Sequence, residues 1–147
     1  MKEIRTEIDI KASPEKTWKI LTDFERYQEW NPFIRHISGV PKVGSNLEIH
    51  IQTPKGKNRI YRPRVTKVDP FHELRWYGKS FVPGLFNGER IFTIEPLKSN
   101  DRVHFVHTEI FTGLIVTLIG NKLDKDMHES FLKMNNSFKQ EVEQATT

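Results

Sequence analysis

The sequence contains no cysteine, and this absence excludes several kinds of site at once. A chain without cysteine has no disulfide bond, no thiolate ligand for a metal ion and no cysteine nucleophile. The same composition suits a protein of the cytoplasm, which is where we expect this one to work. The stretch MKEIRTEIDIK is charged along its whole length and lacks the apolar core of a signal peptide, so we expect no secretion signal.

Long hydrophobic runs and a strong charge of one sign are also missing. The longest mainly apolar run covers residues 114–119, which is far too short to cross a bilayer, so we predict no stable membrane insertion. The formal net charge is +4, a modest excess that gives little support to a nucleic-acid partner. We therefore expect no nucleic acid to bind.

Known catalytic and metal-binding motifs are absent as well. The six histidines are scattered, and the sequence has no H-E-x-x-H, no G-x-S-x-G and no phosphate-binding loop. His104 and His107 would point to opposite faces of a strand, so they do not easily bind one ion together. We therefore predict no metal and no cofactor.

What the sequence does contain fits one folded domain. With 147 residues, 36% of them hydrophobic and 11% aromatic, the chain is long enough for one substantial core, and it shows no linker or internal repeat. We assign residues 1–147 to a single domain. The sequence does not decide between a monomer and a dimer.

The N-terminal segments predict one strand followed by two short helices. Apolar and charged residues alternate in EIRTEIDI, which indicates a strand with one buried face. In KASPEKTWKIL, Ser13 is suited to the cap of a helix and Pro14 to its first turn. The segment TDFERYQEW predicts a second short helix, which ends at EWNPFI because Pro32 disfavours helical backbone at the residue before it.

Residues 34–110 carry mostly strand signals. Alternation of apolar and polar residues occurs in NLEIHIQ, ELRWYG, ERIFTIE and RVHFVHTEI, and Pro63 suggests an edge position or a bulge within NRIYRPRVTKV. ERIFTIE and RVHFVHTEI form a hairpin around PLKSND. The repeated hairpins predict one antiparallel, strongly curved sheet.

The last third of the chain changes to a helical period. Apolar residues recur there at steps of three or four: Ile119, Leu123, Met127, Phe131, Met134, Phe138 and Val142. This stripe predicts a helix that begins at about Leu114 or Thr117 and ends at Gln144. At 1.5 Å per residue the helix is roughly 40 Å long, which is enough to cross the whole sheet.

This order of elements is that of the helix-grip fold, and the sequence resembles the START-like, or SRPBCC, superfamily and within it the polyketide cyclase/dehydrase-like group. The matching stretches are EIDIKASPEKTWKILTDFERYQEWNPFI, GSNLEI, VDPFHELRWYG, PGLFNGERIFTIEP and VHTEIFTGLI. The resemblance implies an α+β fold in which a curved seven-stranded antiparallel sheet wraps around the long C-terminal helix, with two short helices after the first strand. It also implies a cavity between sheet and helix. Members of the superfamily bind lipids, hormones or polyketides, and only some are enzymes.

We expect this cavity to bind a small, largely apolar molecule that is lipid-, polyketide- or isoprenoid-like. EWNPFI would then lie at the cavity mouth. The apolar walls that we predict are Trp30, Phe33, Trp76, Phe86, Phe92, Phe105, Leu118, Met127, Phe131 and Met134. Flexible methionines suit such a wall, but periodicity alone does not separate a wall from an ordinary core.

Three polar residues are predicted on the inward face of the hairpin: Arg90, His107 and Glu109. The register that we predict pairs Ile94 with Val103, Phe92 with Phe105 and Arg90 with His107. Because an unpaired buried charge is costly, the three residues either satisfy one another or face the cavity and orient a ligand's oxygen atoms. The alternative is a cyclase- or dehydratase-type enzyme, a lyase or isomerase, in which His107, Glu109 and Arg90 carry out proton transfer. His107 would be the general base and Glu109 its orienting carboxylate.

A third hypothesis concerns the basic segment 55–67, which carries cations and no acid. These cations are Lys55, Lys57, Arg59, Arg62, Arg64 and Lys67. An anionic surface of RNA or lipid would attract such a segment. Tyr61 is its sole aromatic residue, so recognition by stacking is poorly supported, and a solvated hairpin that protects a sheet edge is the simpler interpretation. We rank ligand binding first.

Overall fold

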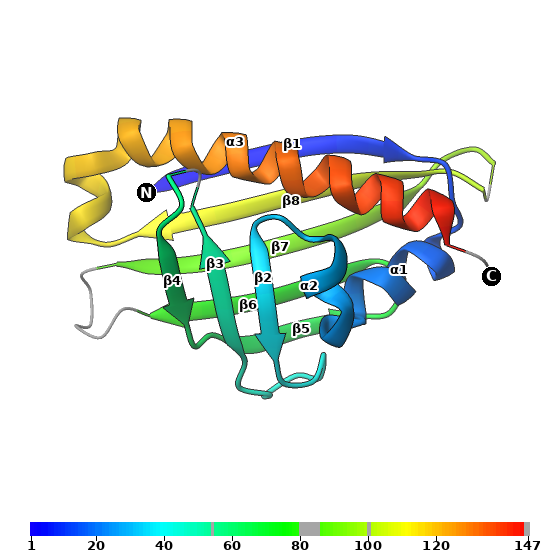
Figure 1. Cartoon of the computed structure of the whole chain (residues 1–147), viewed down its shortest axis with the longest axis horizontal. Helices are drawn as coiled ribbons and strands as arrows, with labels where there is room; N and C mark the ends of the chain where they lie inside the picture. Colours follow the sequence, from blue (N-terminus) through cyan, green and yellow to red (C-terminus); the bar gives the residue numbers. More distant parts are fainter. Residues whose placement is uncertain (54, 80–85, 100, 146–147) are drawn as a thin grey trace.

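Strands and one long C-terminal helix make up most of the computed structural model, which describes residues 1–53, 55–79, 86–99 and 101–145, with the backbone alone for residues 120–124. The described elements, in chain order, are β1 (Lys2–Ile10), α1 (Pro14–Thr22), the 3₁₀ turn η1 (Phe24–Arg26), α2 (Tyr27–Trp30), β2 (Ile34–Ser38), β3 (Glu48–Gln52), β4 (Asn58–Tyr61), β5 (Arg64–Asp69), β6 (Glu73–Lys79), β7 (Asn87–Pro96), β8 (Val103–Thr112) and α3 (Leu114–Gln144). This confirms the predicted α+β order of a strand, short helices, further strands and a long final helix (Figure 1).

The strands form two antiparallel sheets that face each other. One sheet has the order β1-β8-β7-β6-β5, and the other has the order β2-β3-β4 and crosses in front of it in Figure 1. Backbone hydrogen bonds join the two sheets, because Leu47 N donates to Pro63 O at 2.8 Å and Val65 N donates to Ser45 O at 2.9 Å. The two sheets together therefore act as one strongly curved surface.

Within the described residues, eight strands replace the seven that the sequence predicts, and Pro63 explains the difference. The predicted strand NRIYRPRVTKV is divided into β4 and β5 at Arg62 and Pro63. Proline has no backbone N–H to donate to a neighbouring strand, so the ladder is interrupted there. The interruption lets the chain turn from one sheet into the other.

The register of the β7–β8 hairpin differs from the predicted one by two residues. Pro96 pairs with Val103, and Arg90 therefore pairs with Glu109 instead of His107. Side chains alternate with a period of two, so a shift of two leaves each residue on its predicted face. The predicted partners are wrong, whereas the predicted inward faces are correct.

Local sequence signals place the short helices. Ser13 Oγ accepts a hydrogen bond from Lys16 N at 3.2 Å, and Pro14 occupies the first turn of α1, as predicted. Asn31 ends α2: its Oδ1 accepts from Phe33 N at 2.9 Å and from Ile34 N at 2.8 Å. This side-chain turn starts β2 directly after the helix.

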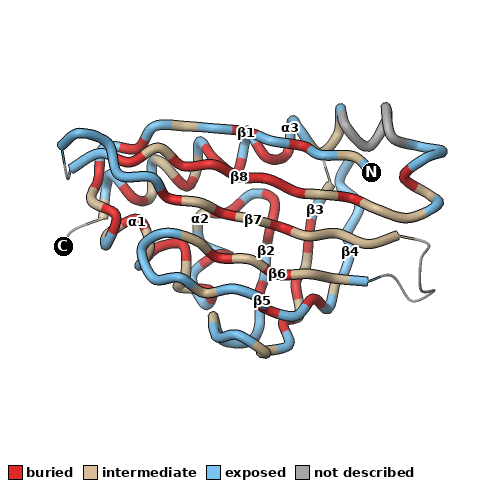
Figure 2. The backbone as a smooth tube through the Cα atoms, turned by 180° about the vertical axis from the view of Figure 1, so that it is seen from behind, coloured by how far each residue is buried: buried red, intermediate tan, exposed pale blue. Residues whose placement is uncertain are grey.

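Helix α3 packs along β1 and closes the open side of the curved surface. Gly113 precedes it with φ of 115°, a conformation that suits glycine. At 1.5 Å per residue its 31 residues span about 46 Å. Met134, Phe138 and Val142 on its inner side are fully buried. Figure 2 shows buried residues along β8 and its neighbours, so the core lies between sheet and helix.

Candidate functional site

A cavity of about 390 Å³ lies between the small sheet, the strands β6–β8 and the first half of α3. Its lining residues are Ile49, Ile51, Ile60, Tyr61, Arg62, Pro63, Trp76, Gly78, Lys79, Phe86, Gly88, Arg90, Glu109, Phe111 and Met127. This volume is within the range of small-molecule pockets, which are mostly apolar with a few polar groups. The lining of this cavity is likewise mostly apolar, with a few polar and charged groups.

The cavity has an exposed rim and a buried floor. At the rim, Ile60 is 51% exposed, and Arg62 and Lys79 are also exposed. On the floor, Trp76 and Arg90 are each 4% exposed. A molecule in the cavity would therefore meet charged groups at both ends and apolar groups between them.

The structure divides the predicted wall residues into cavity and core. Trp76, Phe86, Arg90, Glu109 and Met127 line the cavity, as predicted. The remaining buried or half-buried residues of the predicted wall belong to the packed core instead: Trp30, Phe33, Phe92, Phe105, His107, Phe131 and Met134. The prediction that they line the cavity is wrong, because their partners across the core fill the space in front of them.

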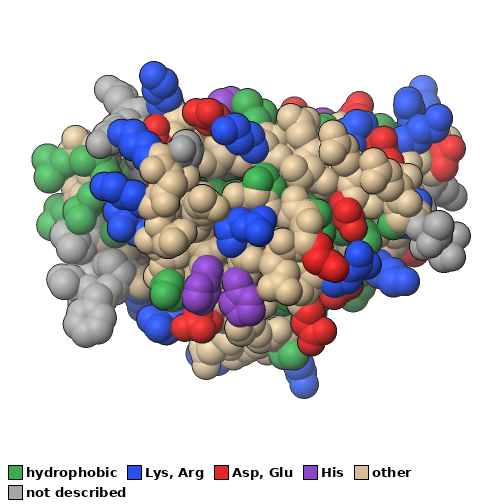
Figure 3. Space-filling view, viewed as in Figure 1, with side chains coloured by type: hydrophobic (Ala, Val, Ile, Leu, Met, Phe, Trp, Pro, Cys, Tyr) green, Lys and Arg blue, Asp and Glu red, His purple; other side chains and the backbone are tan. Residues whose placement is uncertain are grey.

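Leu118 lies outside both groups. Its side chain is 83% exposed, and Figure 3 shows hydrophobic side chains on the surface at the end of the molecule where α3 begins. The apolar stripe that faces the sheet consists of residues three or four positions apart, and Leu118 falls off that stripe. Its predicted place in the wall is therefore wrong.

EWNPFI is a corner of the core and does not form the cavity mouth. Phe33 is 1% exposed, and its ring lies 5.7 Å from that of Phe131 on α3. The ring of Trp30 lies 5.4 Å from that of Phe138. The end of α2 thus holds the small sheet against the long helix through contacts in the packed core.

Arg90 and Glu109 form a buried ion pair on the cavity floor. They are directly opposite each other on β7 and β8, and Arg90 Nε lies 2.9 Å from Glu109 Oε2. The guanidinium carbon also lies 4.9 Å from the ring centre of Phe131 and 5.2 Å from that of Phe33. These contacts compensate part of the cost of burying the charge.

The Glu109 carboxylate is incompletely satisfied. Its Oε2 is buried and lies in the ion pair with Arg90, but it accepts no hydrogen bond from any described residue. Burial raises the pKa of Glu109 to about 6, against the lowering effect of Arg90. Gly88 makes room for this carboxylate, because a Cβ there would lie 2.6 Å from Glu109 Oε1.

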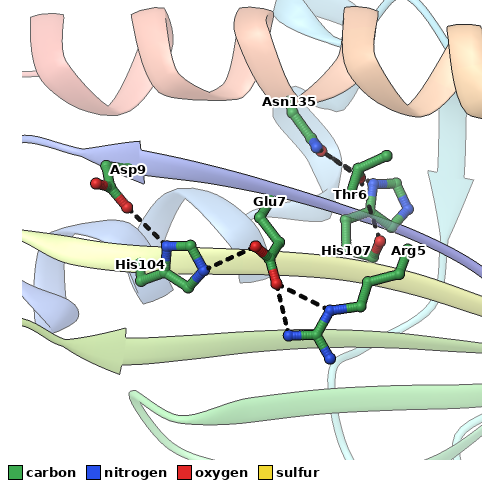
Figure 4. Close-up of polar contacts among 7 residues, drawn as sticks. All are labelled: Arg5, Thr6, Glu7, Asp9, His104, His107 and Asn135. Carbon is green, nitrogen blue, oxygen red and sulfur yellow. Dashed lines mark hydrogen bonds and ion pairs between the residues drawn. The ribbon is translucent and has the colours of Figure 1, made fainter.

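His107 lies deeper, in a chain of hydrogen bonds that links three strands and α3. Arg90 Nη1 lies 2.8 Å from His107 Nε2, and His107 Nδ1 lies 3.0 Å from Asn135 Oδ1. Asn135 Nδ2 donates to Thr6 Oγ1 at 2.7 Å, and Thr6 Oγ1 donates to the His107 carbonyl oxygen at 3.2 Å. Figure 4 shows the side chains of Thr6, His107 and Asn135 together beneath the helix.

This chain determines the protonation of His107. A guanidinium has no acceptor atom, so Nε2 accepts from Arg90 and Nδ1 carries the proton that is donated to Asn135. Burial, together with the charge of Arg90, holds the pKa of His107 well below its usual value. Both ring nitrogens are engaged away from the cavity, and Glu109 pairs with Arg90. The structure gives no hydrogen bond between the side chains of Glu109 and His107, and a catalytic role for either residue stays a prediction.

His104 points to the other face of β8, as predicted. Its Nδ1 lies 2.6 Å from Asp9 Oδ1, and its Nε2 lies 3.5 Å from Glu7 Oε2 (Figure 4). The hydrogen bond with Asp9 raises the pKa of His104. This is a surface cluster without contact to the cavity.

Sequence reasoning missed the two polar residues that complete the network. Thr6 alternates inward with the isoleucines of β1, but nothing in the sequence distinguishes it from an ordinary strand threonine. Asn135 lies four residues after Phe131, on the inner face of α3, and this spacing is the signal that would have found it. Ile49 and Ile51 also line the cavity. They are apolar positions of the alternating segment NLEIHIQ, but the sequence-based prediction did not assign them to the wall.

The basic segment is partly neutralised within the molecule. Arg62 Nη2 lies 3.1 Å from Glu48 Oε1, and Lys67 Nζ lies 3.1 Å from Glu73 Oε2. Lys55, Lys57 and Arg59 are exposed. Binding of an anionic surface by this segment stays a prediction.

The described residues show neither a metal-binding cluster nor a membrane-spanning helix. They contain no group of three or more His, Cys, Asp or Glu side chains placed to hold a metal ion. None of their helices combines the length and the apolar character that crossing a bilayer requires.

Comparison with solved structures shows the fold. A START superfamily protein from Mycobacterium smegmatis matches with a TM-score of 0.80 at 21% identity, over 98% of this chain and 99% of that one. The Zhui aromatase/cyclase from Streptomyces sp. R1128 matches with a TM-score of 0.78 at 13% identity, over 97% and 93%. A protein from Thermus thermophilus matches with a TM-score of 0.77 at 18% identity, over 99% of both chains.

Comparison of the sequence itself gives the family. The comparison with curated proteins gives no match. A family model described as polyketide cyclase / dehydrase and lipid transport matches residues 1–143, which is nearly the whole chain. The resemblance noted in the sequence is thereby confirmed. This chain belongs to the polyketide cyclase/dehydrase and lipid transport family.

Proposed function

We propose that the protein binds a small, largely apolar molecule in the cavity between its two sheets and α3, with Arg90 and Glu109 as the polar contacts. One observation carries this proposal: a cavity of about 390 Å³ whose walls are mainly aliphatic and aromatic and whose floor holds one buried ion pair. Apolar walls contribute affinity by burying surface at about 25 cal/mol per Å². The ion pair orients the molecule.

The membership of the family supports this proposal. Its description includes lipid transport, and one neighbour in fold is described as an aromatase/cyclase. Lipids and polyketides are both largely apolar molecules with a few oxygen atoms. The cavity of this chain has the corresponding mixture of groups.

The test is the binding of prodan, a polarity-sensitive naphthalene dye without a hydrogen-bond donor. Fluorescence titration of the purified protein is expected to give saturable binding at one site. Met127 lines the cavity, so Met127→Trp is expected to fill part of it and to weaken prodan binding by about tenfold or more, since each lost 1.4 kcal/mol of affinity is a factor of ten.

Leu118→Trp is the matched control, because it introduces the same side chain on the same helix at an 83% exposed position. It is expected to bind prodan like the wild type. The proposal fails if prodan does not bind, or if both tryptophan variants bind it as well as the wild type does. If the proposal holds, native mass spectrometry of the protein from its own cells is expected to show the natural ligand as a co-purifying apolar mass.

A second candidate function is proton transfer on a bound polyketide-like substrate, as in a cyclase or dehydratase. The observation that favours it is Glu109, a carboxyl group on the floor of an apolar cavity with its pKa raised by burial to about 6. A carboxylate in this position has a pKa suited to a general base near neutral pH. Glu109 would act alone, since His107 is engaged elsewhere.

Deuterium exchange tests this second function. The ligand extracted from the native complex would be returned to ligand-free protein in D₂O and its mass followed. A base at Glu109 is expected to exchange protons at an enolisable carbon, and Glu109→Gln is expected to abolish the exchange. A ligand that stays unlabelled with the wild-type protein would contradict catalysis and leave a carrier.

A further inference from the structure

Gly78 on β6 is a glycine that the described parts of the protein do not require. The ladder between β6 and β7 continues through the pairs Gly78–Gly88 and Lys79–Asn87 without a shift of register, so this glycine does not form a bulge. Its backbone is also outside the left-handed region that favours glycine. A Cβ added to it would have Pro63 as its nearest neighbour, at 3.4 Å, which is an ordinary van der Waals contact. An alanine would therefore fit at this position.

The glycine opposite Gly78 has an explanation within the protein. A Cβ at Gly88 would lie 2.6 Å from Glu109 Oε1, so the carboxylate takes the place of a side chain there. Gly78 has no such substitute among the described residues. A glycine inside a strand is less stable than an alanine, and where it forms no bulge it often marks a site that a ligand approaches closely.

The empty side-chain position at Gly78 opens into the cavity. Side chains of a strand alternate, so a side chain at this position would point the same way as that of Trp76, two residues earlier on the cavity floor. Gly78 itself lines the cavity and is half-buried. A molecule in the cavity can therefore touch its backbone.

The depth of this empty position limits what it accepts. Two facing sheets pack about 10 Å apart, and the side chains of each sheet fill roughly half of that distance. Ile49 and Ile51 of the small sheet line the same cavity from the opposite side. The space left above Gly78 is then about 5 Å deep, which admits a flat ring or a single hydrocarbon chain. Fused saturated rings are thicker, because their hydrogen atoms project from both faces.

We infer that Gly78 determines which molecules the cavity accepts: the ligand lies against its backbone with a thin part, a flat ring or a single chain. This inference rests on the proposed function and narrows the class of its ligand. Saturated fused-ring molecules are excluded at this position by their thickness, although they are as apolar as the molecules that fit.

Displacement of prodan by a matched pair of compounds tests the inference. The pair is 2-naphthaleneethanol, whose ring system is flat, and decahydro-2-naphthaleneethanol, which has the same carbon skeleton and hydroxyl group but saturated rings. Burial of apolar surface alone would favour the saturated compound, because its surface is larger. The wild type is expected instead to bind the flat compound about tenfold more tightly, the effect of one misfitting methylene group in a pocket.

Gly78→Ala places a methyl group in the empty position and is expected to weaken binding of 2-naphthaleneethanol by about tenfold. Ser38→Thr is the matched control, because it adds one methyl group to an exposed position of β2 that does not line the cavity. It is expected to bind both compounds as the wild type does. Each affinity is calculated with the dissociation constant of prodan for the same protein.

The outcomes separate the inference from the proposed function. If prodan binds but the saturated compound displaces it as well as the flat one does, the inference is wrong while the proposed function stands. The inference is also wrong if Gly78→Ala binds 2-naphthaleneethanol as tightly as the wild type does. If prodan itself does not bind to the wild type, the proposed function fails and the inference fails with it.

Discussion

Among single residues, Glu109 and His107 are the buried titratable groups that most affect how the protein responds to pH. Burial disfavours the charged form of each, so the pKa of Glu109 is raised to about 6 and that of His107 is held well below its usual value. As the pH falls below about 6.5, an unfolded His107 takes up a proton that the folded protein does not bind, and stability decreases. Glu109 has the opposite effect, since the folded protein binds its proton more tightly than the unfolded chain does.

We predict that Glu109→Gln gains stability relative to the wild type as the pH rises from 4.5 to above 6. In this window the unfolded carboxyl ionises before the folded one, so the wild type alone loses free energy of unfolding. A pKa raised from 4.5 to about 6 corresponds to on the order of 2 kcal/mol. The measurement is urea denaturation of both proteins at pH 4.5, 5.5 and 7.

The comparison is informative because His107 is present in both proteins. Its contribution to the pH dependence of the free energy of unfolding therefore cancels in the difference between them. Loss of the pair with Arg90 changes the stability of the variant by an offset, whereas only the titration of Glu109 makes the difference depend on pH. A difference that stays constant across this range would show that Glu109 has an ordinary pKa in the folded protein.

At the scale of elements, Asn135 is the polar connection between α3 and the strands beneath it. It accepts the His107 Nδ1 hydrogen at 3.0 Å and donates to Thr6 Oγ1 at 2.7 Å. Apolar contacts along the rest of the helix are non-directional, but these two hydrogen bonds require one position of the helix along β1 and β8. Asn135 therefore sets how α3 lies on the sheet.

Asn135→Ala is expected to lower the free energy of unfolding by about 2–3 kcal/mol, because it leaves the buried Nδ1–H of His107 without an acceptor and removes the hydrogen bond that Thr6 Oγ1 accepts. Asn136→Ala, one residue further along the same helix, makes the same change at an exposed position and is expected to have little effect. Urea denaturation of the two variants is the measurement. Equal stabilities would mean that the buried network contributes nothing net.

The paired glycines of β6 and β7 give a second prediction for these elements. Gly78 and Gly88 are directly opposite each other and both line the cavity. A Cβ at Gly88 would lie 2.6 Å from Glu109 Oε1, whereas one at Gly78 would lie 3.4 Å from Pro63 Cβ. Gly88→Ala is therefore expected to displace the carboxylate from its pair with Arg90 and to lower the free energy of unfolding by about 1–3 kcal/mol, the cost of leaving a buried polar group without its partner.

Gly78→Ala adds the same methyl group to the same cavity without touching the carboxylate, and it is expected to be nearly as stable as the wild type. Urea denaturation measures both variants. If Gly78→Ala lowers the free energy of unfolding as much as Gly88→Ala does, the loss comes from adding a methyl group to these paired strands, and the position of Glu109 is not what matters.

Alternation in the sequence was sufficient to predict the inward faces of Arg90, His107 and Glu109, because a strand repeats every two residues. It was insufficient for their pairing, which depends on where the hairpin turns, and the predicted register is wrong by two residues. Alternation also does not distinguish residues of the cavity wall from residues of the packed core. Phe92 and Trp76 both point inward, yet Trp76 alone of the two borders the cavity, because what lies opposite each depends on the packing of distant strands.

Across the whole molecule, the space between sheet and helix is solid at one end and hollow at the other. Near the short helices, Phe33, Phe131 and Phe138 fill it, with rings of neighbouring elements in contact. Toward the beginning of α3, Met127 borders the cavity instead. The apolar stripe of α3 thus has two roles. Its second half packs in the core, and Met127 in its first half borders the cavity.

This division predicts opposite outcomes for one substitution at two places on α3. Met134 is fully buried in the packed part, so Met134→Trp must force its neighbours apart and is expected to lower the free energy of unfolding by about 1–3 kcal/mol. Met127→Trp extends into empty space and is expected to keep the stability of the wild type or to increase it, because it buries apolar surface without a clash. Urea denaturation of both variants without ligand is the measurement. A Met127→Trp variant as unstable as Met134→Trp would show that the space beside Met127 is filled in solution, and the cavity on which the proposed function depends would be refuted.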